Sequence, residues 1–335
     1  MSDAGQFRSS AATRLLRVLV VLPFLLLPAT QAVPSPIRAD RPPAPGMHVW
    51  VGDHRLHLDC KGAGSPTVVF DAGLGGSSLD WTLVQPEVAT FTRACAYDRA
   101  GYAWSDPGPM PRDAKSIVRD LEQLLGNGSV AAPYVLVGHS LGGLIVQHFA
   151  RQNPHRIAGL VLVDATHEDQ FRRLRETVVP ARGLRTRRWS LITTTDSYQV
   201  PDGLPEEIRR LAGAFVVRPQ SIVVVRSELS FLRRTSAPLA SSARLPDVPL
   251  VVISHRLVSP AADTREGQFE QTWMELQQEL AAMTRRSEHV IAGTEDHHIH
   301  IAEPQTVIDA VRGVVEQSRA TTTSPVRARL TGDNR

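Results

Sequence analysis

Short apolar runs alternate with helical segments along most of this chain, and this alternation limits its fold more than any other feature. Apolar strands separated by amphipathic helices predict a mostly parallel, doubly wound α/β sheet with helices on both faces. We expect about eight strands, with a hairpin formed by the first two. The runs that predict strands lie at or within residues 47–51, 55–60, 67–73, 93–101, 134–140, 157–170, 249–254 and 289–293.

The segment between the strand near Asp164 and the strand starting at Pro249 has a different character. Helices are expected there at residues 204–215 and 221–234. Open α/β sheets place their sites at the carboxyl ends of the strands, so this insertion is expected to cover the site as a helical cap. The predicted domains are an α/β core at residues 47–170 and 246–318, and a cap at residues 171–245.

The N-terminal residues have the order of an export signal. A basic region ending at Arg17 precedes the apolar run VLVVLPFLLLPA, and small residues follow. This order predicts a signal peptide at residues 1–32 and a protein exported to the cell envelope or beyond. The apolar run is shorter than the roughly 20 residues that span a bilayer. A retained N-terminal membrane anchor from Leu15 to Ala32 is the alternative.

The charge composition limits the classes of molecule that the protein can bind. The formal net charge is +3, of which residues 1–32 carry +2, so the rest offers no electrostatic basis for nucleic-acid binding. Arginines between Arg172 and Arg188 are expected to form a solvated face, with an acidic substrate or an anionic membrane surface as the alternative partner. Residues 33–46 predict a proline-rich linker and residues 319–335 a disordered tail. The oligomeric state stays open.

The motif GHSLGG at residues 138–143 directs attention to Ser140. It follows the apolar run YVLV and opens a helix, so Ser140 is expected in a sharp strand-to-helix turn that exposes its hydroxyl. Gly138 and Gly142 remove side chains that would clash in that turn. The N–H groups at the start of the helix point toward the same place. Ser140 is therefore the predicted nucleophile, rather than one residue of an ordinary glycine-bounded turn.

This motif, together with other segments, resembles the α/β-hydrolase fold superfamily, and specifically its serine hydrolases with a helical cap. The resemblance covers about residues 46–317 and rests on VVFDAGLGGSSLDW, CAYDRAGYAWSDP, VGHSLGG, DHHIHIAEPQTVIDAV and the insertion of cap size. It implies a small-molecule acyl substrate and no metal or organic cofactor.

The resemblance also implies a catalytic base in the loop after the last strand. In the family pattern a proline follows that histidine by seven residues, and Pro304 then selects His297. His298 is the alternative base, and His300 is expected to pack below. A metal site in the DHHIH cluster is the other interpretation, but no spaced cysteines or helical histidine pairs support it.

The acid of the triad should lie between the serine and the histidine in the chain. The usual family position follows the strand at residues 249–254, where HRLVSPAAD delays the first aspartate to Asp263. Asp164 ends the preceding strand at the same height as Ser140, and some relatives, including haloalkane dehalogenases, carry the acid there. We expect Asp164, with Asp263 as the alternative. A structural Asp164 would instead cap the following turn.

The resemblance assigns the oxyanion hole to the backbone N–H groups of Leu141 and Leu74. Ala72 replaces the histidine usual in that loop. The backbone donor remains in place, but the loop loses the bracing that the histidine would give.

In this superfamily the strands that hold Cys60 and Cys95 are neighbours. Export would permit a disulfide between these cysteines.

The sequence thus predicts a serine hydrolase that cleaves a carboxylic ester or a related acyl bond through an acyl-serine intermediate. A peptidase or thioesterase of the same fold is the alternative, and a non-catalytic ligand-binding relative is the alternative from another class. Dehalogenases and epoxide hydrolases of this superfamily use aspartate as nucleophile, and Ser140 argues against them. The apolar cap residues Trp189, Phe215, Ile222 and Phe231 are expected to pack on the core, or to line an acyl pocket.

Overall fold

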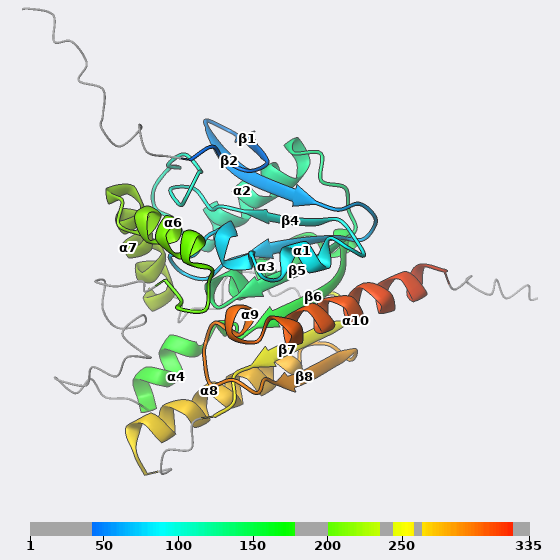
Figure 1. The fold of residues 1–335 in the computed structure, drawn as a ribbon. Coiled ribbons are helices and arrows are strands. Elements are labelled where there is room, and N and C mark those ends of the chain that lie inside the picture. The colour runs from blue at the N-terminus through cyan, green and yellow to red at the C-terminus, as the bar shows by residue number, and fades with distance from the viewer. Residues whose placement is uncertain (1–41, 178–199, 235–243, 258–262, 324–335) are drawn as a thin grey trace, which may run out of the picture. The chain divides into compact units, whose positions relative to one another are not determined.

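The computed structural model describes residues 42–177, 200–234, 244–257 and 263–323 (Figure 1). The chain divides into two units, Met1–Pro43 and Ala44–Arg335, and all the elements below belong to the second. The expected signal peptide lies outside the described residues, as do most of the linker and two parts of the cap, with Trp189 among them. Within the described residues, no helix is both long and apolar enough to cross a membrane.

Within the described residues, eight strands form one sheet in the order β1-β2-β4-β3-β5-β6-β7-β8. The hairpin β1-β2 pairs antiparallel, β2 also pairs antiparallel with β4, and all the other neighbours are parallel. This confirms the predicted mostly parallel α/β sheet. The strands are β1 Met47–Val51, β2 His54–Lys61, β3 Thr67–Asp71, β4 Ala94–Tyr97, β5 Tyr134–His139, β6 Ile157–Val163, β7 Leu250–Ser254 and β8 Ser287–Ile291.

Helices cover both faces of the sheet (Figure 1). Alternate residues of one strand belong to two different hydrophobic clusters: Leu136 packs with helices α2 and α3, whereas Val135 and Val137 pack with α10. Every position of a central strand is therefore buried, which explains the uninterrupted apolar runs in the sequence. The helices are α1 Gln85–Val88, α2 Ala114–Asn127, α3 Leu141–Gln152, α4 Gln170–Thr177, α6 Glu206–Val216, α7 Pro219–Arg234, α8 Arg265–Ala281, α9 Ile299–Ala302 and α10 Pro304–Thr323, with 3-10 turns at Ser78–Trp81 and Pro154–Arg156. Helix α10 thus continues past residue 318, into the segment expected to be a disordered tail.

The described part of residues 171–245 contains α6 and α7. Phe215 of α6 is buried and packs edge-on against Trp104, with the ring centroids 4.9 Å apart. Phe231 of α7 is also buried, whereas Ile222 is 39% exposed. Phe215 and Phe231 are therefore interior residues, and Ile222 lies at the surface.

The described arginines at the start of the basic segment are paired within the protein. Arg172 lies 3.0 Å from the carboxylate of Asp169, and Arg173 lies 2.7 Å from that of Glu275. Arg185, Arg187 and Arg188, on which the alternative of an anionic surface also depends, lie outside the described residues.

Cys60 and Cys95 lie directly opposite each other on the antiparallel strands β2 and β4. Their Cα atoms are 4.0 Å apart, and a disulfide joins the side chains. Because β1 and β2 pair with the rest of the sheet only through β4, this bond ties the N-terminal hairpin to the parallel core.

Candidate active site

Ser140 lies in the turn between β5 and α3, with φ 50° and ψ −119°. A positive φ is unfavourable for serine and persists only where the surroundings impose it. The amide of Ser140 donates to the carbonyl of Val163 (3.1 Å), and its own carbonyl accepts from Gly143 (3.0 Å) and Thr166 (2.9 Å). These bonds hold the residue at the carboxyl edge of the sheet, with its side chain partly exposed.

The glycines of the motif permit close contact between backbones. A Cβ at Gly138 would lie 2.5 Å from the carbonyl oxygen of Gly142, and one at Gly142 would lie 2.3 Å from that of Asp71. No side chain fits at either position. The start of α3 therefore packs directly on the end of β3, from which the predicted oxyanion loop leaves.

The loop after β3 lies beside the serine. A Cβ at Gly73 would be 3.3 Å from the Cβ of Ser140. Leu74 follows Gly73 directly, so its backbone is close to the hydroxyl. Leu141 is the first residue of α3, and an N–H at that position has no acceptor within the helix. Both predicted oxyanion donors are therefore near Ser140.

Arg99 braces this loop, and it is a residue whose role we did not predict. Its guanidinium donates to the carbonyls of Ala72 (2.5 Å) and Gly73 (2.8 Å). It also pairs with the carboxylates of Asp71 (2.7 Å) and of Glu228 on α7 (3.0 Å), and all three charged side chains are buried. Arg99 thus braces the loop in which Ala72 stands at the position where the resemblance implies a histidine. A basic residue directly after the buried run CAYD was the available signal.

The predicted base and acid are in contact. His297 donates from Nδ1 to Oδ2 of Asp164 at 2.6 Å, which leaves Nε2 to accept a proton. Asp164 follows β6 directly with a φ of 44° and is fully buried. The alternative acid, Asp263, is exposed just before α8 and is not the carboxylate that meets His297.

A second histidine connects the base to the serine turn. Nε2 of His139, the residue before Ser140, donates to the carbonyl of His297 at 3.0 Å, and the two rings are 4.6 Å apart. The other members of the cluster have further partners: His298 pairs with Asp296, and His300 is buried between Trp81 and His139. Burial and the neighbouring histidines hold the pKa of His139 well below its usual value. The ring is therefore neutral where an enzyme works.

Asp164 accepts further hydrogen bonds at the bottom of the site. Nε1 of Trp273 donates to Oδ1 at 2.9 Å, and Nδ1 of His255 donates to Oδ2 at 2.7 Å. Burial by itself would raise the pKa of Asp164, but the charge and hydrogen bonds of His255 and the bond from His297 outweigh burial and hold the pKa well below the usual range. Asp164 is therefore ionised at neutral pH.

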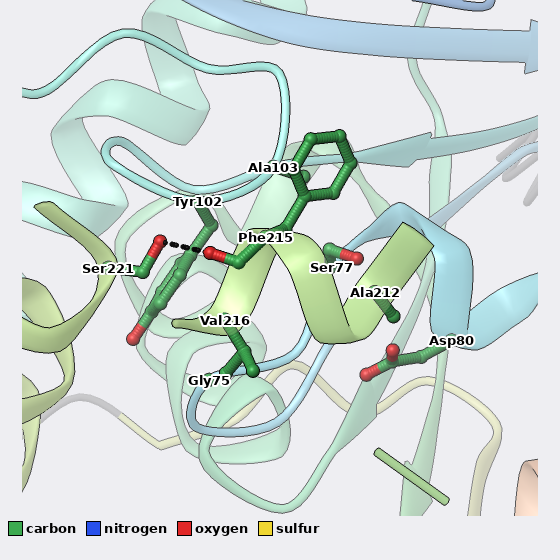
Figure 2. Close-up of a pocket in the computed structure, with 9 residues that line it drawn as sticks. All are labelled: Gly75, Ser77, Asp80, Tyr102, Ala103, Ala212, Phe215, Val216 and Ser221. Atoms are coloured by element: carbon green, nitrogen blue, oxygen red, sulfur yellow. Dashed lines mark hydrogen bonds between the residues drawn. The ribbon is translucent and has the colours of Figure 1, made fainter. Parts of the chain in front are cut away.

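A small cavity lies where α6 meets the oxyanion loop (Figure 2). Its volume of about 10 Å³ accommodates no more than one water molecule, so it is not a substrate pocket. Figure 2 shows Ser221 bonded to the carbonyl of Phe215, which fixes the turn between α6 and α7. The lining residues are Gly75, Ser77, Asp80, Tyr102, Ala103, Ala212, Phe215, Val216 and Ser221.

The part of the chain that the structure describes contains no group of three or more histidine, cysteine, aspartate or glutamate side chains arranged to hold a metal ion. The DHHIH cluster instead makes the contacts to Asp164, Asp296 and Trp81 given above.

Comparisons with known proteins agree with the fold described above. The model of the alpha/beta hydrolase family matches residues 68–310. The uncharacterised protein YqjL of Bacillus subtilis (strain 168) is 27% identical over 254 residues, which cover 76% of this chain and 85% of YqjL. A solved candidate epoxide hydrolase from Pseudomonas aeruginosa has a TM-score of 0.64 at 15% identity, covering 82% of this chain and 96% of its own. A thermophilic esterase from Thermogutta terrifontis has a TM-score of 0.56 at 18% identity, covering 81% and 98%. At these identities the two structures show a common fold alone.

Proposed function

Because this chain belongs to the alpha/beta hydrolase family, we propose that it is a serine hydrolase that cleaves a carboxylic ester or a related acyl bond. The observation that carries the proposal is the hydrogen bond from His297 to Asp164 beside the strained turn at Ser140. A hydroxyl nucleophile, an imidazole base and a carboxylate that orients the base are what acyl transfer through a covalent intermediate requires. The structural neighbours are named for epoxide and ester hydrolysis, and a serine in the turn favours the second.

The first half of the reaction forms an acyl-serine. Oγ of Ser140 attacks the carbonyl carbon while Nε2 of His297 takes the hydroxyl proton. Asp164 holds the imidazole with Nδ1 protonated and stabilises the cation. The N–H groups of Leu141 and Leu74 bind the oxyanion of the tetrahedral intermediate. The His297 imidazolium then gives its proton to the leaving group as the bond to that group breaks.

The second half returns the free enzyme. Water attacks the acyl carbon, and His297 removes a proton from it. The tetrahedral intermediate collapses, the bond to Oγ of Ser140 breaks, and His297 returns the proton to the serine. Apart from water and a small acyl substrate, every group in this cycle belongs to the chain itself.

Labelling with a fluorophosphonate tests the nucleophile. The wild-type protein is expected to be labelled at Ser140, and S140A is expected to lose labelling and at least about 10³-fold of its turnover of a model acyl ester. The matched control is S287A, a change at an exposed serine of β8, which should keep both. Binding of acyl ligands without any labelling of the wild type would instead identify a non-catalytic ligand-binding relative.

The leaving group is tested separately. One acyl group is presented as its ester, thioester and amide, and kcat/KM is measured for each. The proposal expects the ester to be cleaved best. A higher kcat/KM for the thioester or the amide would move the assignment to a thioesterase or a peptidase with the same catalytic residues.

A further inference from the structure

Asp164 belongs to a row of four ionisable side chains, of which all but His297 are buried, and the mechanism above uses only two of them. His297 contacts Asp164, Asp164 contacts Nδ1 of His255 at 2.7 Å, and Nε2 of His255 contacts Oε2 of Glu270 at 3.1 Å. His255 is 2% exposed and Glu270 is 1% exposed. Charged groups are this deeply buried only when each is paired, so the row acts as a unit.

The fold brings Asp164, His255 and Glu270 together from three elements. His255 directly follows β7, which pairs with β6, the strand that ends at Asp164. The amide of Asp164 donates to the carbonyl of Ile253 at 2.7 Å, which places the carboxylate against the end of β7. Glu270 and Trp273 lie one turn apart on α8 and so share a face of that helix. Glu270 meets His255, while Trp273 donates to Asp164.

His255 carries a full charge in this row. Each of its ring nitrogens faces a carboxylate oxygen, so both must carry a hydrogen. Burial would lower the pKa of His255, but the charge of Asp164 and the bonds to Asp164 and Glu270 raise it to about 10. A cation beside Asp164 would by itself cancel the charge that stabilises the His297 imidazolium. Glu270 restores one negative charge to the row.

We propose that His255 and Glu270 are positioning residues for the catalytic triad. His255 fixes the carboxylate of Asp164 through its ring and through its own backbone amide, which lies 3.4 Å from Oδ1. Glu270 balances the charge of His255, so that Asp164 still attracts a proton on His297. The inference rests on the proposed serine-hydrolase function.

The other titratable groups around the row stay the same in the variants below. His297 is also faced by His139, by His298 and Asp296 of its own loop, and by His300. Burial and neighbouring histidines lower the pKa of His300 well below its usual value, as they do for His139. Among the described residues, His255 is faced by the carboxylates of Asp164 and Glu270, and His289 on β8 contacts the preceding Ser254 instead.

Two variants move the charge in opposite directions. H255N keeps an amide donor for Asp164 but removes the positive charge, so two carboxylates favour protonation of His297. E270Q removes one negative charge, so protonation of His297 becomes harder. A unit charge at this range changes a titration by about one pH unit. The double variant H255N/E270Q has the same net charge in the row as the wild type.

The experiment follows the rate constant for phosphonylation of Ser140 by a fluorophosphonate between about pH 5 and about pH 9, a range that covers the usual titration of histidine. The low-pH limb of this profile reports protonation of the base. We expect H255N to move it to higher pH, E270Q to move it to lower pH, and the double variant to return it toward the wild type. Single variants that leave the limb in place, or move it in one common direction, would overturn the proposal. A wild-type protein that never reacts would instead overturn the serine-hydrolase function.

A second measurement does not need catalysis. Ring nitrogen NMR of the full chain labelled in histidine should find that His255, whose signal is identified by its loss in H255N, stays doubly protonated from about pH 6.5 to about pH 8.5. The assignment separates it from His57, whose ring also faces a carboxylate and a carbonyl. If the assigned His255 signal loses a proton in that range, the charged state of His255 and the proposal with it are wrong. Thermal unfolding of each variant is measured first, so that a loss of folding is not taken for a shifted profile.

Discussion

Arg99 joins the oxyanion loop to α7. It is the common partner of two buried carboxylates, Asp71 and Glu228, and of two loop carbonyls. Tyr97 donates to Asp71 and Tyr102 to Glu228, each at a normal distance, so the network is satisfied as long as the guanidinium is present. Burial raises the pKa of Asp71 in spite of Arg99, which marks how costly an unpaired charge would be there.

The variant R99M is therefore expected to destabilise the protein by about 3–5 kcal/mol, because it leaves buried charges without their partner. Urea unfolding monitored by circular dichroism measures the change. R93M is the matched control, since Arg93 is partly exposed and its side chain donates to the carbonyl of Ser129 rather than to a carboxylate, and it should change stability by less than about 0.5 kcal/mol. Equal effects of the two changes would contradict the assignment.

The charged state of His255 also makes stability depend on pH. Its pKa is raised from the usual 6.5 to about 10 in the folded protein. The folded state therefore keeps a proton that the unfolded chain has lost. Its stabilisation is complete below about pH 6.5 and is lost as the pH rises through about 10. Within that window we expect His255 to lower the free energy of unfolding by up to about 1.4 kcal/mol per pH unit.

Urea unfolding at several pH values checks this expectation. Wild type and H255N are compared, because groups that titrate elsewhere contribute the same slope to both. The wild type should lose stability more steeply as the pH rises. Parallel curves for the two proteins would show that His255 does not hold its proton.

At the level of elements, the antiparallel hairpin is the part of the sheet that needs a covalent tie. Strand β1 pairs only with β2, and β2 reaches the parallel strands only through β4. The disulfide between Cys60 and Cys95 closes a loop with a sequence separation of 35 at that junction. A disulfide that closes a loop of this length reduces the conformational entropy of the unfolded chain. This reduction corresponds to about 4 kcal/mol of stabilisation of the folded protein.

The variant C60A/C95A is therefore expected to unfold at a lower urea concentration, with a loss on the order of 3–4 kcal/mol. A reducing agent should lower the stability of the wild type but leave that of the double variant unchanged. The labelling of Ser140 at room temperature should persist, because the hairpin contributes no group to the proposed site. A wild type insensitive to reduction would contradict a structural role for this bond.

At the scale of the whole molecule, features set by local sequence patterns could be predicted, whereas contacts between residues far apart in the chain could not. The buried strands were predictable because a strand covered on both faces must be apolar at every position, which is a local pattern. The position of Asp164 at the end of such a strand was predictable for the same reason. Arg99 and Glu228 were not, because their pairing joins residues 129 positions apart. The same holds for Glu270, whose role depends on where α8 passes β7.

The acid of the triad illustrates the same limit. From the sequence, the absence of an aspartate just after β7 left both Asp164 and Asp263 open. In the structure, His255 occupies the position directly after β7. Its ring donates a hydrogen bond to the carboxylate of Asp164. Asp263 is exposed and lies away from that contact. No local sequence pattern shows that the side chains of His255 and Asp164 meet across two neighbouring strands.

The proposed site exists only because loops at the ends of three strands converge, and this makes the last prediction one about the whole molecule. Ser140 follows β5, Asp164 follows β6 and His297 lies in the loop after β8. Residues that act as one unit in catalysis lose their effects together rather than additively. The variants S140A and H297A are therefore each expected to lose at least about 10³-fold in kcat for a model ester, and S140A/H297A to lose no more than S140A alone. Steady-state kinetics of the three variants measure this, with S287A as the control. If the losses multiply in the double variant, the serine and the histidine act independently, and the three loops do not form one catalytic centre.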